Sequence, residues 1–360
     1  MESSFATIIP HYSPRAISPR YYRKKKLARL SIIGVASALL IFLANFLFLI
    51  PASVAVFTEG LPAIPIFLFI PFPIHFFTIP KDLAFFYALF IFISLFICIG
   101  YLFWTDGRNA AKIIRKGWQN WDAPSLSHQN SVLLLVVQFF MVLFVTNALV
   151  ALLFAGSNAE GTSTTIDSPA LLLFVLANAV IFEELTFRVL LIGFPLLIFD
   201  YFRRRDQKRK IMEYLLIGNS KNKIGVPETA LIVVSSMLFA LAHVFGGWGL
   251  WKILTTFPAG LALGYLFIKK GFPAAVLLHF CFNYLTAPLL VFLAFNLWSG
   301  FLLQMEVVLI FSLIASGLSL IALLMLLCWF LTGSFYLIEL SRIFRAQVAN
   351  KQGLSHNQAE

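Results

Sequence analysis

Eight long apolar runs constrain the fold of this chain more than any other feature. A membrane-spanning helix needs about 20 mostly apolar residues. Such runs occupy residues 30–50, 83–104, 131–155, 169–200, 227–245, 250–268, 272–296 and 301–333. Only 12% of the 360 residues are charged, whereas about a quarter are charged in a soluble domain. We therefore predict an all-α, multi-pass transmembrane helix bundle of about eight spans.

A ninth apolar stretch, at residues 62–79, is interrupted by proline. Pro62, Pro65, Pro71 and Pro73 lie within it, and Pro80 follows it directly. Proline lacks a backbone N–H and clashes with the preceding helical turn, so a segment with this many prolines does not form a regular helix. We predict a re-entrant or interfacial segment rather than a full crossing.

The basic residues indicate the topology. If the N-terminus is cytoplasmic and each of the eight runs crosses once, 24 of the 27 lysines and arginines fall on the cytoplasmic side. Lys81 and Lys252 fall outside, and Arg188 lies within a span. This bias satisfies the positive-inside rule, and an extra crossing at 62–79 would reverse it. We predict cytoplasmic termini, in the cell membrane if the chain is prokaryotic.

The same bias explains the net charge of +11. Nucleic-acid binding is the alternative interpretation of a basic chain, but here the charges flank hydrophobic spans, so we expect no nucleic-acid partner. The predicted division is a basic tail (1–28), an N-terminal transmembrane region (29–130), a transmembrane core (131–333) and a second cytoplasmic tail (334–360). We expect the three cysteines to be packing residues; they are Cys98, Cys281 and Cys328. We expect three tryptophans to anchor the chain at the membrane interface; they are Trp248, Trp251 and Trp298.

The first motif within the spans is Glu-Glu-Leu-Thr-Phe-Arg at residues 183–188. Ionisable residues inside a membrane are costly, face the bundle interior and usually mark function. Helical spacing places Glu184 and Arg188 on one face, where they can neutralise each other. Glu183 is left without that partner and is a candidate general base. The structural alternative is a buried ion pair that only fixes helix packing.

Two further motifs carry histidines. Phe239 and His243 form Phe-x-x-x-His, and a single histidine of this kind can equally be a hydrogen-bonding link between helices. His279 and Asn283 are four residues apart and share a helix face, so both can point into one cavity. The alternative for this pair is an interhelical polar clamp. Glu183 and His279 lie at similar depths in the membrane when counted along their runs. His243 lies about 24 Å from the inner end of its run, so it reaches the same depth only if that helix projects into the cytosol, tilts strongly or stops short of the outer face.

These three motifs, in this order and each on its own apolar run, resemble the CPBP family (CAAX protease and bacteriocin-processing) of intramembrane peptidases. That family includes CAAX prenyl proteases of the Ras-converting type and bacterial proteins tied to bacteriocin processing or self-immunity. The resemblance covers about residues 168–296 and implies that Glu183 activates a water molecule with help from His243. It implies that His279 and Asn283 stabilise the oxyanion, while the neighbouring Glu184/Arg188 pair supports the site.

The chemistry leaves the role of metal open. Amide hydrolysis needs an activated water and donors for an oxyanion, which a glutamate, two histidines and an asparagine can supply. Glu183, His243 and His279 also match the ligand count of a catalytic zinc site, although the sequence lacks HExxH. The cofactor is therefore either none or zinc.

The resemblance implies an endopeptidase that cuts a membrane-associated, lipidated or small peptide substrate, with membrane lipids as its other partners. A non-catalytic scaffold or immunity protein with the same fold is one alternative, because fold does not fix function. A transporter is a second, but it would favour an inverted repeat, and the sequence shows none.

Overall fold

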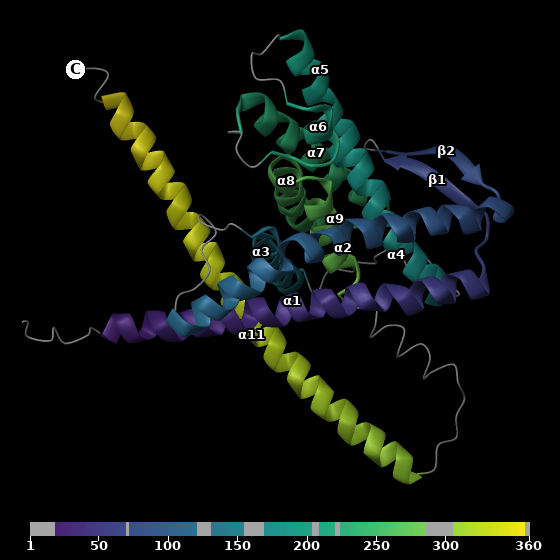
Figure 1. Cartoon of the computed structure of the whole chain (residues 1–360), viewed down its shortest axis with the longest axis horizontal. Helices are drawn as coiled ribbons and strands as arrows, with labels where there is room; N and C mark the ends of the chain where they lie inside the picture. The colour runs from purple at the N-terminus through teal and green to yellow at the C-terminus, as the bar shows by residue number, and fades with distance from the viewer. Residues whose placement is uncertain are drawn as a thin grey trace, which may run out of the picture.

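The computed structural model describes residues 19–69, 72–120, 131–154, 169–203, 209–219, 224–285 and 305–356. Helices dominate these ranges, and seven of the helices there are long and apolar enough to cross a membrane. This confirms the predicted multi-pass helical bundle and makes the chain an integral membrane protein (Figure 1). The spans fall at Leu27–Glu59, Lys81–Asn120, Val132–Leu153, Ala170–Phe202, Val226–Phe245, Leu250–Lys270 and Leu323–Ala346.

The proline-rich stretch is a β-hairpin between the first two long helices. Helix α1 (Pro19–Glu59) leads into strands β1 (Ile64–Phe69) and β2 (Pro73–Ile79), which pair antiparallel, and helix α2 (Lys81–Asn120) follows. Proline is tolerated in edge strands, and both strands of a two-stranded sheet are edges. Strands of six and seven residues are shorter than the 9–11 or so that a membrane crossing needs. The segment is therefore neither helical nor spanning.

The core helices follow in sequence order. They are α3 (Val132–Leu153), α4 (Pro169–Glu184), the π-helix η1 (Leu185–Gly193), α5 (Phe194–Phe202), α6 (Ile211–Leu215), α7 (Val226–Phe245), the short 3-10 helix η2 (Leu250–Lys252), α8 (Ile253–Lys270), α9 (Phe272–Asn283) and α11 (Met305–His356). The α4, η1 and α5 segments adjoin without a break and form one long span. In Figure 1, α11 crosses the bundle and extends beyond it at both ends.

Several element boundaries differ from the predicted ones. Helix α1 begins at Pro19, inside the predicted tail, and α11 continues to His356, through most of the predicted C-terminal tail. The run predicted at 272–296 contributes the short helix α9, which ends at Asn283, and residues 286–304 lie outside the described ranges. Apolar runs mark where lipid contacts a helix, but a helix can continue into water, which explains the longer ends.

Helix α9 sits at the centre of the bundle. Nine of its 12 residues are buried, and α2, α3, α4 and α8 all pack against it. A helix that is apolar all round requires such an environment. Because α9 carries His279 and Asn283, this packing places both side chains inside the bundle rather than toward lipid.

Candidate active site

The adjacent glutamates of the first motif lie where α4 changes into the π-helix. Glu184 is the last residue of α4, and Leu185 begins η1. Short π-helical segments inside α-helices occur frequently at functional sites, because the wider turn redirects side chains. The Nε of Arg188 donates to Oε2 of Glu184 at 3.1 Å, and both side chains are fully buried. The predicted ion pair is therefore present.

Arg188 is fixed by two further contacts from α7. Its Nη1 donates to the hydroxyl of Ser235 at 3.2 Å, and its guanidinium lies 5.0 Å from the ring centroid of Phe239. Ser235 in turn donates to the carbonyl of Phe187. A buried charge needs such compensation. These contacts tie the π-helix to the helix that carries His243, and the sequence motifs gave no sign of Ser235.

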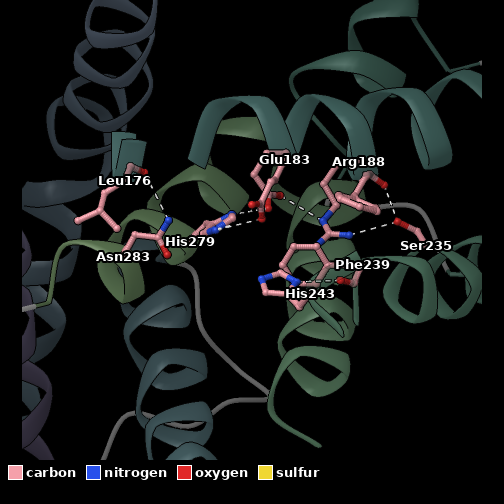
Figure 2. A network of polar contacts seen from close by, with 10 residues as sticks. Leu176, Glu183, Arg188, Ser235, Phe239, His243, His279 and Asn283 are labelled. Carbon is pink, nitrogen blue, oxygen red and sulfur yellow. Dashed lines mark hydrogen bonds and ion pairs between the residues drawn. The ribbon is translucent and has the colours of Figure 1, made fainter. Parts of the chain in front are cut away.

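His279 lies between the two glutamates. Its Nδ1 is 2.9 Å from Oε1 of Glu184, and its Nε2 is 3.7 Å from Oε2 of Glu183. The carboxylate of Glu184 can only accept, so Nδ1 carries the proton and the ring orientation is set. A histidine whose second nitrogen is held by a carboxylate presents its first nitrogen in a defined position. That nitrogen faces Glu183 (Figure 2).

Glu183 differs from its neighbour in its surroundings. Its side chain is 26% exposed, against 0% for Glu184. Its Oε2 is nevertheless buried and has no hydrogen-bond partner among the described residues. The Glu183 charge interacts electrostatically with His243 and with Lys252. The sequence-based expectation that Glu183 lacks the arginine partner is confirmed.

His243 reaches the same site from the end of α7. Its Nδ1 lies 2.8 Å from the carbonyl oxygen of Phe239, which can only accept, so Nδ1 carries the proton and Nε2 is left as an acceptor when the ring is neutral. His243 is 17 residues beyond the start of α7, whereas His279 is seven beyond the start of α9. The two histidines are therefore brought to one site from different distances along their helices.

Asn283 is on the same face of α9 as His279, as predicted, but its amide is turned elsewhere. Its Nδ2 donates to the carbonyl of Leu176 at 3.4 Å. Figure 2 shows His279 between Asn283 and Glu183. Asn283 therefore does not contact the Glu183 carboxylate in this arrangement.

The geometry gives no support to a zinc site. Within the ranges that the structure describes, no group of three His, Cys, Asp or Glu side chains is arranged to hold a metal ion. His243 and His279 each direct Nδ1 to a protein oxygen, which orients the ring and leaves Nε2 free.

Lys252 was not predicted to belong to the site. The sequence suggested that it lies outside the membrane beside two anchoring tryptophans. In the structure, Lys252 ends η2, and its charge acts on Glu183. Spacing cannot reveal this proximity, because it depends on the turn between α7 and α8.

Residues 165–285 match the family model described as type II CAAX prenyl endopeptidase Rce1-like. The matched segment contains the six polar residues of the three motifs and agrees closely with the region expected from them. These residues are Glu183, Glu184, Arg188, His243, His279 and Asn283. For this part of the chain, the match confirms the resemblance to the CPBP family. No curated protein and no solved structure matches the chain.

Proposed function

We propose that this protein is an intramembrane endopeptidase that hydrolyses a peptide bond near the C-terminus of a lipidated, membrane-associated substrate. The observation that carries the proposal is the approach of His279 Nε2 to Glu183 Oε2, at 3.7 Å, with Glu184 holding the opposite ring nitrogen. The Rce1-like match over residues 165–285 supports a prenylated CAAX sequence as the substrate class.

Glu183 is the proposed general base. A water molecule positioned by Glu183 and by the Nε2 of His243 loses a proton to the Glu183 carboxylate as its oxygen attacks the scissile carbonyl carbon. The carbonyl oxygen becomes the oxyanion of a tetrahedral intermediate. When the intermediate collapses, the C–N bond breaks and Glu183 passes its proton to the leaving nitrogen. The products are one new carboxylate and one new amine.

His279 and Asn283 are the proposed oxyanion donors. The Nδ1–H of His279 is already donated to Glu184, so its Nε2 can donate only when the ring is protonated. The bond from Asn283 to Leu176 is long, at 3.4 Å, compared with about 2.9–3.0 Å for an ordinary N–H···O bond. The Asn283 amide can therefore exchange it for a charged oxyanion, which accepts more strongly.

We propose a mechanism in which these side chains act without a metal ion. The proposal rests on the lack of a three-ligand metal group in the described ranges and on the Oε2 of Glu183, which has no hydrogen-bond partner there. We further propose that both termini are cytoplasmic, because a crossing by the 272–296 run, which begins with α9, adds an eighth crossing to the seven spans and satisfies the positive-inside rule.

The test is cleavage of a farnesylated CAAX peptide by purified protein in detergent. Wild type is compared with Glu183→Gln, and Glu59→Gln serves as the matched control because Glu59 ends α1 outside the motif region. The proposal expects cleavage by wild type and by the control only. Equal cleavage by Glu183→Gln would exclude Glu183 as the base. Absence of cleavage by every protein, across a panel of lipidated peptides, would favour the scaffold.

A further inference from the structure

The turn that follows α7 folds back onto the catalytic helix. Helix α7 ends at Phe245, two residues after His243, and Gly247 has a φ of 100°, a conformation that favours glycine. The backbone N–H of Trp248 then donates to the carbonyl of His243 at 3.1 Å. Trp248 is therefore held at a fixed position next to the end of the helix that carries His243.

Lys252 rests on this turn. Its Nζ lies 4.2 Å from the ring centroid of Trp248 and 5.6 Å from that of Trp251, and the two rings are nearly perpendicular. Cation–π contacts of this kind hold an ammonium group in place without neutralising it. No carboxylate among the described side chains forms an ion pair with Lys252. Its charge interacts electrostatically with that of Glu183, but the two side chains do not form an ion pair.

Trp251 adds a second donor at the same place. Its Nε1–H is buried and has no hydrogen-bond partner in the part of the chain that the structure describes. Indole N–H groups usually find an acceptor when buried. A buried N–H without a hydrogen bond lowers the stability of the folded state. An ammonium group and an indole N–H therefore lie together next to Glu183 and His243, and neither has an acceptor. The ligand that satisfies both is an anion with oxygen acceptors.

We propose that Lys252 Nζ and Trp251 Nε1–H bind the free C-terminal carboxylate of the peptide substrate. This inference rests on the proposed function. A CAAX substrate has three residues between the scissile bond and its C-terminus, so an extended substrate places its carboxylate within about 10 Å of that bond. The turn ties Lys252 to the helix that carries His243, because Trp248, which supports the ammonium group, donates its backbone N–H to the carbonyl of His243. The subsite would make the enzyme select peptides by their free end.

The kinetic test compares two farnesylated peptides that both end Cys-Val-Ile-Ala, one with a free carboxylate and one with a C-terminal amide. We expect wild type to prefer the free acid by about ten- to hundred-fold in kcat/KM, the range for a hydrogen bond to a charged group. Lys252→Met should abolish this preference by slowing only the acid, and Lys252→Arg should retain part of it. Lys270→Met, at the other end of α8, should behave as wild type. An equal loss on both peptides in Lys252→Met would overturn the proposal.

Trp251→Phe separates the indole N–H from the ring. It keeps an aromatic ring near Lys252 and removes the donor together with the five-membered ring, so we expect a smaller loss, about three- to ten-fold, again confined to the free acid. If the acid and the amide are affected alike, Trp251 supports the fold and does not bind the carboxylate.

A binding measurement keeps the inference testable when no peptide is cleaved. The tripeptide Val-Ile-Ala and its amide are titrated into the full-length Glu183→Gln protein, and tryptophan fluorescence is followed. Binding of the acid alone, lost in the Glu183→Gln/Lys252→Met double variant, would support a carboxylate subsite even if the proposed peptidase activity is absent. Equal binding of acid and amide, or of neither, would overturn the subsite whatever the cleavage assay shows.

Discussion

The Nδ1 of His279 lies 2.9 Å from Oε1 of Glu184, across 95 residues of sequence. Because Glu184 also pairs with Arg188, its carboxylate is committed on both oxygens. Adjacent glutamates in one motif therefore have different environments: Glu184 is a fixed acceptor that orients a histidine, and Glu183 is left to face the other side of that histidine. This difference leads to opposite expectations for the stability of the Glu183→Gln and Glu184→Gln variants, although the two substitutions are chemically the same.

Glu183→Gln should lower activity strongly and leave stability unchanged or raised. A general base contributes about 10²–10⁴-fold to the rate, whereas Glu183 Oε2 is buried without a hydrogen-bond partner in the described ranges. A carboxylate oxygen that is buried without a hydrogen bond destabilises the folded state, so a neutral isostere at this position should cost little stability. Peptide turnover and thermal unfolding in the same detergent measure the two effects. A large drop in the unfolding temperature would mean that Glu183 holds the fold.

Glu184→Gln should destabilise the protein as well as inactivate it. Removing one partner of a buried ion pair costs about 3–5 kcal/mol, because the other charge stays buried and uncompensated. Adding Arg188→Met should restore much of that stability without restoring activity, since His279 still lacks its orienting carboxylate. Thermal unfolding of the single and double variants tests this. If the double variant is no more stable than Glu184→Gln, the arginine is compensated by other groups.

Much of the fold could be predicted because membrane insertion imposes a simple rule on the sequence. The apolar runs located α1, α2, α3, the α4–α5 span, α7 and α8, and the four-residue spacing of Glu184 and Arg188 predicted their ion pair. Helical periodicity and the apolar character of a span depend on residues that are close together in the sequence. Features that depend only on these two properties can therefore be predicted from the sequence.

Features that depend on partners distant in sequence were missed. The prolines of residues 62–79 exclude a helix, but they do not specify that β1 pairs with β2. Spacing placed Asn283 on the correct face of α9, yet the direction of its amide depends on the carbonyl of Leu176. Lys252 was assigned to the outer side because the alternation of the predicted crossings puts the loop after residue 245 there. Only the turn after α7 brings its charge close enough to act on Glu183.

Ser235 should prove important for stability although no motif contains it. Ser235→Ala removes the acceptor for Arg188 Nη1 and the donor to Phe187, so we expect a loss of about 1–3 kcal/mol. Ser236→Ala is the matched control, because within the described ranges the Ser236 hydroxyl bonds only to the carbonyl of Ile232 in its own helix. Chemical or thermal unfolding of both variants measures the difference. Equal effects would show that the Arg188 contact contributes nothing beyond an ordinary helix serine.

The close packing of α7 against α8 gives a final prediction, because it sets the position of His243. Gly260 and Gly264 form a small-xxx-small pair on α8, a pattern that lets membrane helices approach closely. A Cβ added at Gly260 would lie 2.8 Å from the Cβ of Ser236, and one at Gly264 would lie 3.0 Å from Ile232. At Gly260 the added Cβ would also lie 2.9 Å from the Cα of Ser236. The clash there is with backbone, which cannot move aside as a flexible side chain can.

Gly260→Ala should therefore separate the two helices and cost about 1–3 kcal/mol, as overpacking does. It should also lower activity in the protein that remains folded, because α7 carries His243 and Ser235 into the site. Gly107→Ala is the control: Gly107 is in α2, and nothing lies within 4 Å of its added Cβ. Alanine is the better helix former by about 1 kcal/mol, so this variant should be neutral or more stable. Unfolding temperatures and turnover of the two variants test the argument, and equal behaviour would mean that the α7–α8 contact does not position the site.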